Sequence, residues 1–308
     1  MWKLAKILKE QKVDILHCHR YQASVYGAIA GWLASVPVVF SHVHGINRTR
    51  TARRKLTNRV IFRRVNKILT VGEAVREDVL KTNPTVAPEQ VISLGNSIDY
   101  GRFANVQITK PQAKARINLK PDSVVFGTIG RLVPTKGLSF LIEAFANVKK
   151  QVPTAVLIII GDGRLKDELH KTVSEKALTD CVHFLGQRDD IPMLLRAMDV
   201  FVLASVAEGL PRSLLEAMAS SVPCIAANVG GISEIITDKR SGYLVDAQNV
   251  EALTGAMLEV TNLTAQQLEE LTENARATVV EKFSHKAIIK KLEKIYEEEY
   301  AKKNPQLV

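Results

Sequence analysis

The fold is decided by the stretch Val200-Phe-Val-Leu-Ala-Ser-Val-Ala-Glu-Gly-Leu-Pro-Arg-Ser-Leu-Leu-Glu216. Its apolar beginning, residues 200–204, predicts a buried parallel strand. Pro211 fits the first position of a following helix, because that position does not need the N–H group that proline lacks. Glu208 would then lie on the loop after the strand, and Glu216 on the second turn of the helix. Open α/β sheets bind their ligands at this carboxyl end of the strands.

The start of this helix also favours an anionic ligand. The first N–H groups of a helix have no partner within it, and the helix dipole places partial positive charge there. We therefore predict that the backbone around residues 210–213 binds a phosphate group. The ligand-binding residues expected at this turn are Gly209, Leu210, Pro211 and Arg212.

Length and composition fit a soluble globular protein. The 308 residues are enough for two α/β domains or one large domain, and 46% apolar with 24% charged residues is ordinary for such a chain. No run of 18 apolar residues appears, and lysines recur through the amphipathic first ten residues, so neither a membrane span nor a signal peptide is predicted. An odd set of cysteines in or beside predicted strands indicates a reducing compartment, the cytoplasm: Cys18, Cys181 and Cys224.

Apolar runs alternate with helical patterns along the whole chain, which is typical of βαβ units and parallel sheets. A first series of strands is predicted at 13–17, 38–42, 67–71 and 91–94. A second series is predicted at 124–129, 156–160, 182–185, 200–204, 224–227 and 243–245. The stretch 104–122 separates the two series, because it holds two prolines and has no strong periodicity. We therefore predict two domains, 1–103 and 104–283.

Three glycine motifs accompany the two glutamates, each at a predicted strand end. They are Gly130-Arg-Leu-Val-Pro-Thr-Lys-Gly137, Gly161-Asp-Gly163 and Gly230-Gly-Ile-Ser-Glu234. With Glu208 and Glu216, and in this order, they closely resemble the signature of retaining glycosyltransferases of family 4, whose two acids form an E-x7-E motif. The resemblance covers nearly the whole chain and implies the GT-B fold, with two Rossmann-like α/β domains. It also implies that a final helix, 284–302, packs back onto the first domain.

The resemblance implies a function as well. It predicts a bacterial-type, hexosyl-transferring enzyme that moves a sugar from a nucleotide-sugar donor to a surface glycan or glycolipid acceptor, in the biosynthesis of polysaccharide or lipopolysaccharide. Two alternatives belong to other classes. One is an inactive nucleotide-binding module that acts through a partner. The other is a hydrolase or epimerase of nucleotide sugars.

Arg131 and Lys136 are suited to stabilise the charge that grows on a leaving diphosphate, because both are permanent cations near a strand end. The alternative reading is a pair of solvated loop cations. The neighbouring Gly130 and Gly137 favour the functional reading, since glycine lets the backbone approach a ligand closely.

The resemblance assigns both glutamates to the donor: Glu216 to the ribose hydroxyls and Glu208 to the sugar. The alternative for Glu216 is an exposed helix acid, and for Glu208 it is an acid at a helix amino terminus that the helix dipole favours. Further donor contacts are expected at Gly161 and at the backbone near Gln187 and Arg188. The implied reaction is a front-face substitution, in which the leaving phosphate accepts the proton of the acceptor. No cofactor and no metal are expected, because two cations take the place of an ion and the chain lacks a D-x-D motif.

Four histidines form a second group. His17 and His19 alternate along one predicted strand, and His42 and His44 lie at the end of the next, so each pair faces one side of the sheet. Four imidazoles could bind zinc, but no carboxylate or thiol is placed to complete a conventional set of ligands, and we expect no metal. The resemblance maps a contact with the donor sugar and phosphate onto His44, in the sequence Ser41-His-Val-His-Gly45, with His42 as the second candidate. His17 and His19 are interpreted as structural or acceptor-side residues.

The chain departs from the family at its start. It begins at the helix before what resembles the fourth strand of the first domain, Asp14-Ile-Leu-His-Cys-His19. This predicts an incomplete first domain whose strand edge is bare. We expect a truncated chain; a fragment, or a variant whose edge a partner covers, are the alternatives.

The net charge of +10 is concentrated in one segment. Nine basic and no acidic residues lie between Arg48 and Lys67. Phe62 is the only aromatic there, so nucleic-acid binding has little support. The apolar residues Leu56, Val60, Ile61 and Val65 suit one helix face, and the basic residues would form the other. The simpler interpretation is a helix whose basic face is solvated. The more specific hypothesis is that this face binds an anionic membrane surface, on the inner side of the cytoplasmic membrane.

Overall fold

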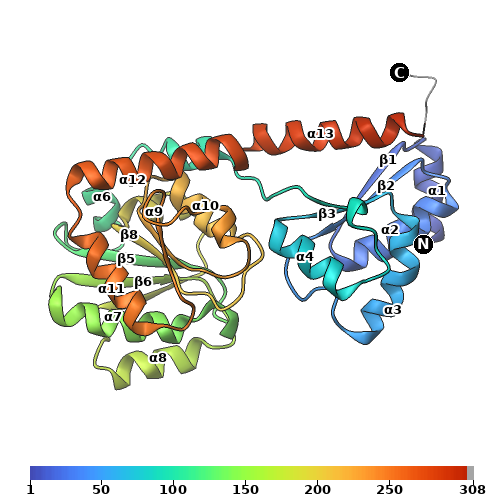
Figure 1. Cartoon of the computed structure of the whole chain (residues 1–308). Helices are drawn as coiled ribbons and strands as arrows, with labels where there is room; N and C mark the ends of the chain where they lie inside the picture. Colours follow the sequence, from blue (N-terminus) through green and yellow to red (C-terminus); the bar gives the residue numbers. More distant parts are fainter. Residues whose placement is uncertain (304–308) are drawn as a thin grey trace. The chain divides into compact units, whose positions relative to one another are not determined.

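The computed structural model describes residues 1–303, and the chain divides into two compact units (Figure 1). Unit 1 comprises Met1–Asn96 and the chain from Lys286 onward, and unit 2 comprises Ser97–His285. The predicted boundary after residue 103 falls inside a short helix, α5 (Tyr100–Ala104). This helix belongs to unit 2, where the Arg102 guanidinium donates to the carbonyl oxygen of Asp189 at 3.4 Å. Both units are parallel-sheet α/β structures, which confirms the predicted fold class.

Unit 1 is built on a four-stranded parallel sheet with the order β1-β2-β3-β4. Among the described residues β1 pairs with β2 alone, so it forms one edge of the sheet. The strands are β1 (Ile15–His19), β2 (Val38–Val43), β3 (Lys67–Thr70) and β4 (Val91–Ser93). The helices are α1 (Trp2–Glu10), α2 (Tyr21–Leu33), α3 (Ala52–Ile61), which continues as η1 (Phe62–Arg64), α4 (Glu73–Thr82), η2 (Pro88–Gln90) and α13 (His285–Ala301).

Side chains of β1 alternate between two layers of helices. Cys18 and Leu16 face α2, where they lie against two glycines that leave room for them. On the other face, Ile15 packs with the apolar side chains of α13, and the buried Ile288 and Ile295 of this helix join the same cluster. Unit 1 is therefore completed by the carboxyl-terminal helix (Figure 1).

Unit 2 contains a six-stranded parallel sheet with the order β10-β9-β8-β5-β6-β7. The strands are β5 (Val124–Ile129), β6 (Ala155–Ile160), β7 (Val182–Gly186), β8 (Val200–Leu203), β9 (Cys224–Ala227) and β10 (Tyr243–Val245). Helices cover both faces of the sheet (Figure 1). They are α6 (Lys110–Ala115), η3 (Pro134–Lys136), α7 (Leu138–Gln151), α8 (Lys166–Glu175), α9 (Ile191–Ala197), α10 (Arg212–Ala219), η4 (Gly230–Glu234), α11 (Val250–Thr261), α12 (Ala265–Thr278) and the π-helical turn η5 (Val279–Phe283).

A group of three charges anchors α6 to the sheet of unit 2. The carboxylate of Asp199, just before β8, accepts hydrogen bonds from Lys110 and Lys114, each at 2.8 Å. It also accepts a bond of 2.8 Å from the N–H of Val125. Burial raises the pKa of Asp199, but the two lysines and the hydrogen bonds outweigh burial and lower it overall. The ammonium of Lys114 is buried, so Asp199 supplies its main countercharge.

We expect Asp199→Asn to lower the free energy of unfolding by about 2–4 kcal/mol, because the buried ammonium of Lys114 loses its countercharge. Urea denaturation followed by circular dichroism measures this change. The matched control is Asp122→Asn, which alters an exposed acid and should stay within about 0.5 kcal/mol of the parent. Equal midpoints for the two variants would contradict the anchoring role.

Candidate active site

Two of the predicted site residues of unit 2 meet where the sheet changes direction. Strand β5 pairs with β6 on one side and with β8 on the other, so the chain winds outward in both directions from this point. A sheet of this kind opens a crevice at the carboxyl ends of the two strands that flank the switch. The loops that follow β5 and β8 carry Lys136 and Glu208.

Lys136 and Glu208 form an ion pair across this switch point. The Lys136 Nζ lies 2.6 Å from Oε1 of Glu208, and the side chains are only 17% and 11% exposed. The hydroxyl of Ser205 donates to the same Oε1 at 2.6 Å. The structure thus brings together two residues that the sequence predicted separately. The ammonium of Lys136 contacts the carboxylate of Glu208 where little solvent reaches either group.

Ser205 is a site residue that the sequence analysis missed. It follows the apolar strand directly and is fully buried, and its hydroxyl fixes the carboxylate of Glu208. A buried hydroxyl immediately after a core strand was the available signal, because such a group needs a hydrogen-bond partner. Ser205 therefore orients Glu208 from the sheet side.

Glycine is required in two of the turns that form the site. Gly137 has a φ of +60°, and a Cβ there would collide with the carbonyl oxygen of Ala204. Gly161 has a φ of +135°, and a Cβ there would collide with the carbonyl oxygen of Gly130. These contacts pack the turn after β5 against its two neighbours, the end of β8 and the turn after β6.

The turns after β6 and β7 are joined in the same way. The N–H of Gly161 donates to the carbonyl oxygen of Gly186 at 2.8 Å. Gln187 is the next residue in the chain, so this bond places it beside the turn after β6. The guanidinium of Arg188 is bound to the carboxylate of Asp190 through two hydrogen bonds of 2.8 and 2.6 Å. Its charge is engaged locally, which leaves the backbone of residues 187 and 188 as the group expected to contact a ligand.

Helix α10 begins at Arg212, with Pro211 as its N-cap. The prediction that Pro211 occupies the first helical position is therefore wrong by one residue: Pro211 has an extended ψ of 121°. The first intrahelical bond runs from the N–H of Leu215 to the carbonyl oxygen of Pro211. The N–H groups at the start of the helix thus belong to residues 212–214. The preceding Gly209 accepts a hydrogen bond of 2.9 Å from the N–H of Gly231.

Glu216 lies on the second turn of α10, as predicted, and is half-buried. Burial raises the pKa of its carboxyl group, and the nearby guanidinium groups of Arg212 and Arg102 partly offset that effect. Arg102, from α5, was not predicted as part of this region. Arg131 is exposed beside the turn after β5.

His44 lies in unit 1, after the end of β2. Its Nε2 is 3.0 Å from Nδ1 of His19. Burial, His19 and Arg20 lower the pKa of His44 to about 4, so it offers a hydrogen bond at neutral pH and no positive charge. The contact of His44 with a donor stays a prediction.

The basic segment forms α3 and η1, and one part of its predicted pattern is wrong. Ile61 and Val65 are buried, but Leu56 and Val60 are 68% and 61% exposed. Leu56 and Val60 are four residues apart and lie on the outer face of α3. Ile61 is the last residue of α3 and Val65 follows η1, and both of these side chains are buried. Apolar and basic side chains therefore share the exposed face. Within residues 1–303, no helix combines the length and the apolar character that crossing a membrane demands.

Two family models match the chain. The model described as glycosyl transferases group 1 matches residues 109–278, and the model described as glycosyltransferase family 4 matches residues 1–102. Together these stretches contain the switch-point residues of unit 2 and the histidines of unit 1.

Relatives of known or assigned activity match nearly the whole chain. One is a UDP-Gal:alpha-D-GlcNAc-diphosphoundecaprenol alpha-1,3-galactosyltransferase of Escherichia coli, 31% identical over 95% of this chain and 76% of the relative. Another is an N-acetyl-alpha-D-glucosaminyl L-malate synthase of Bacillus anthracis, 27% identical over 96% of this chain and 77% of the relative. Among solved structures, Anabaena Alr3699/HepE in complex with UDP has a TM-score of 0.85 at 24% identity, covering 96% of this chain and 80% of that one.

Proposed function

The chain belongs to the glycosyl transferases group 1 family, and from this premise we propose that it transfers a sugar with retention of configuration from a nucleotide-sugar donor to a lipid-linked glycan acceptor. The ion pair of Lys136 and Glu208 at the switch point of unit 2 carries the proposal. It supplies a cation and a carboxylate where a sheet of this kind binds nucleotides. The alternatives of an inactive module and of a hydrolase or epimerase are not favoured, since the matched families and the E. coli relative are named as glycosyltransferases.

The proposed chemistry is the stabilisation of a leaving diphosphate. Lys136 exchanges its contact with Glu208 for a phosphate oxygen as negative charge grows there, and Arg131 adds a second cation. The N–H groups at the start of α10 bind the same diphosphate. Two cations and a helix start take the role that a divalent ion has in other transferases, so we propose a reaction that needs no cofactor and no metal at the diphosphate.

Both carboxylates bind the donor in this proposal. Glu208, once released from Lys136 and still held by Ser205, accepts hydrogen bonds from hydroxyl groups of the sugar. Glu216 accepts hydrogen bonds from the ribose, which compensates the cost of its burial. With no carboxylate assigned as nucleophile, the acceptor hydroxyl attacks from the side that the phosphate leaves. Its proton passes to the departing phosphate oxygen.

A panel of nucleoside diphosphates and nucleotide sugars, added separately in a thermal-shift assay, tests the donor class. Binding of a ligand at 100 times its dissociation constant stabilises the native state by about 2.7 kcal/mol, which is readily seen as a higher melting temperature. We expect at least one nucleoside diphosphate and its sugar conjugate to raise it. If no member of the panel does so, the donor assignment fails.

The acceptor side of the proposal includes an anionic membrane surface, bound by the outer face of α3. Leu56 and Val60 are exposed on this face among basic residues. Arg64 follows four residues after Val60, and its guanidinium stacks over the half-exposed ring of Trp32 at 4.4 Å from the centroid. Apolar, aromatic and basic groups in one patch suit the interface of a membrane. Each basic residue near anionic lipid adds about 1 kcal/mol.

We expect Val60→Glu to reduce sedimentation with vesicles of anionic lipid at least tenfold, because the change removes an apolar contact and adds a charge of the wrong sign. Co-sedimentation at low and physiological salt measures binding. Val280→Glu is the matched control, since Val280 is 43% exposed but lies in unit 2. Binding that is indifferent to anionic lipid, to salt and to Val60→Glu alike would refute the membrane assignment.

A further inference from the structure

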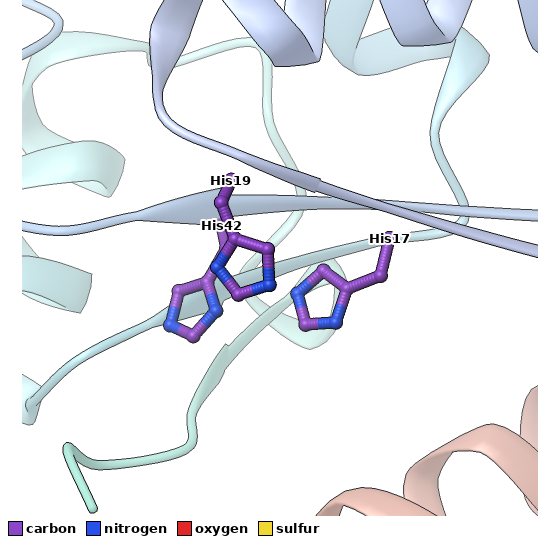
Figure 2. A group of neighbouring side chains, drawn as sticks. All are labelled: His17, His19 and His42. Carbon is purple, nitrogen blue, oxygen red and sulfur yellow. The ribbon is translucent and has the colours of Figure 1, made fainter.

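Three imidazoles meet at the carboxyl ends of β1 and β2 in unit 1, on one face of the sheet (Figure 2). The parallel register places His19 directly opposite His42, and His17 lies two residues earlier on the same face. One ring nitrogen of each residue lies within 4.8 Å of one nitrogen of each of the other two.

Three of the ring nitrogen atoms in this cluster lack the hydrogen bonds that buried polar atoms normally make. Nε2 of His17 and both ring nitrogens of His42 are shielded from solvent and have no hydrogen-bond partner among the described residues. A buried polar atom without a partner costs about 1–3 kcal/mol. Three such atoms in one cluster therefore indicate that a ligand binds among the rings.

Neighbouring groups orient two of the rings toward the cluster. The Nδ1 of His17 lies 2.6 Å from the hydroxyl of Tyr296, and the Nδ1 of His19 lies 3.0 Å from Nε2 of His44. When each Nδ1 carries the proton and donates it to that neighbour, Nε2 of His17 and of His19 presents its lone pair. Histidines that bind metals commonly have an outer partner of this kind, which fixes the ring and its tautomer.

We propose that His17, His19 and His42 bind one divalent transition-metal ion of the zinc class. Imidazole nitrogens suit zinc, copper and nickel, and three protein ligands leave a fourth position open. Metal–nitrogen distances of about 2.0–2.1 Å require the rings to close by roughly 1 Å and to turn out of their present stacking. His42 can turn in this way, because neither of its nitrogens is bound. The expectation that the histidines bind no metal is thereby revised.

The ion would join the ends of β1 and β2 and, through the hydrogen bond of His19, position His44. All three ligands belong to unit 1, whereas Lys136 and Arg131, the cations assigned to the diphosphate, belong to unit 2. Zn²⁺ binding is measured without sugar transfer, so failure of the metal site and failure of the proposed transferase activity are distinguishable.

The test uses the whole chain without a polyhistidine tag, stripped with a chelator and dialysed. Titration with Zn²⁺ against a chromophoric chelator gives stoichiometry and affinity. We expect one Zn²⁺ per chain, and Co²⁺ in its place should give the visible absorption of a four-coordinate nitrogen site. His42→Gln should weaken Zn²⁺ binding at least 100-fold. Tyr296→Phe keeps all three ligands and removes only the outer hydrogen bond, so it should weaken binding about tenfold.

Two controls make the outcome decisive. His170→Gln and His183→Gln alter histidines of unit 2, and each should leave Zn²⁺ affinity within twofold of the parent. Melting temperatures measured without metal show whether each variant folds. If His42→Gln does not fold, the Zn²⁺ affinity of Tyr296→Phe decides the test instead. The proposal is overturned if the parent protein binds less than one Zn²⁺ per chain at micromolar concentrations. It is also overturned if the unit 2 variants weaken binding as much as His42→Gln does.

Discussion

Lys136→Ala should lower kcat/KM for sugar transfer by about 10²–10³-fold, the usual effect of removing one group that stabilises charge in a transition state. The ammonium is only 17% exposed and lies 2.6 Å from Glu208, so water cannot easily replace it. Because the contact with phosphate strengthens as the bond breaks, most of the loss should appear in kcat and little in KM. Initial rates with a fixed acceptor and varied nucleotide sugar separate the two.

The control for this variant is Lys171→Ala, in which the altered lysine is 77% exposed on α8 and pairs with Glu175 at 3.7 Å. It should leave kcat/KM unchanged within twofold. We expect Lys136→Ala to remain folded, because the hydroxyl of Ser205 still donates to the carboxylate of Glu208. Circular dichroism and the melting temperature check this. Turnover by Lys136→Ala at the parental rate would remove the basis of the proposed mechanism.

Glu216→Ala should weaken donor binding by about 10–100-fold, the effect of losing hydrogen bonds between a carboxylate and two hydroxyl groups. The ribose contact is the same in the ground state and the transition state, so the loss should appear in KM. Calorimetric titration with a nucleoside diphosphate measures the affinity directly. The corresponding 2′,3′-dideoxy nucleotide should bind the parent and the variant equally, because it lacks the hydroxyls that Glu216 is proposed to contact.

Glu175→Ala serves as the matched control for Glu216→Ala. Glu175 also lies on a helix of unit 2, but its side chain is 63% exposed. This variant should bind the nucleotide with parental affinity. If Glu216→Ala discriminates between the ribose and dideoxy nucleotides as the parent does, the carboxylate does not contact the ribose.

The strands could be predicted from the sequence because parallel strands are buried on both faces and read as continuous apolar runs. The predictions for β5, β9 and β10 have the observed bounds, at 124–129, 224–227 and 243–245. The first strand was placed two residues too early. Val13 is apolar, but its N–H donates to the carbonyl oxygen of Leu8 and so closes the end of α1. A local hydrogen bond of this kind leaves no mark on hydrophobic periodicity.

The site was predictable to the extent that its residues follow strand ends. Motifs identified Lys136, Glu208 and Glu216, but the ion pair between the first two joins positions 72 residues apart and depends on which strands are neighbours. Arg102 enters the site only through the tertiary structure, whereas Ser205 is three residues from Glu208 and follows a core strand, which was a local signal. The exposure of Leu56 and Val60 could not be predicted either, because four apolar residues at helical spacing do not show which of them the rest of unit 1 covers.

The helix α13 has a consequence for how the molecule is made on the ribosome. It packs on the apolar face of the unit 1 sheet through Ile288 and Ile295, although within residues 1–303 it is synthesised after every strand of both units. The first 96 residues consequently leave the exit tunnel without the layer that shields one side of their strands. Unit 2, whose residues are contiguous from 97 to 285, can acquire its native packing beforehand. The amino-terminal sheet is therefore sealed only after Ile295 has been synthesised, and a nascent chain that stalls before α13 exposes an apolar sheet face.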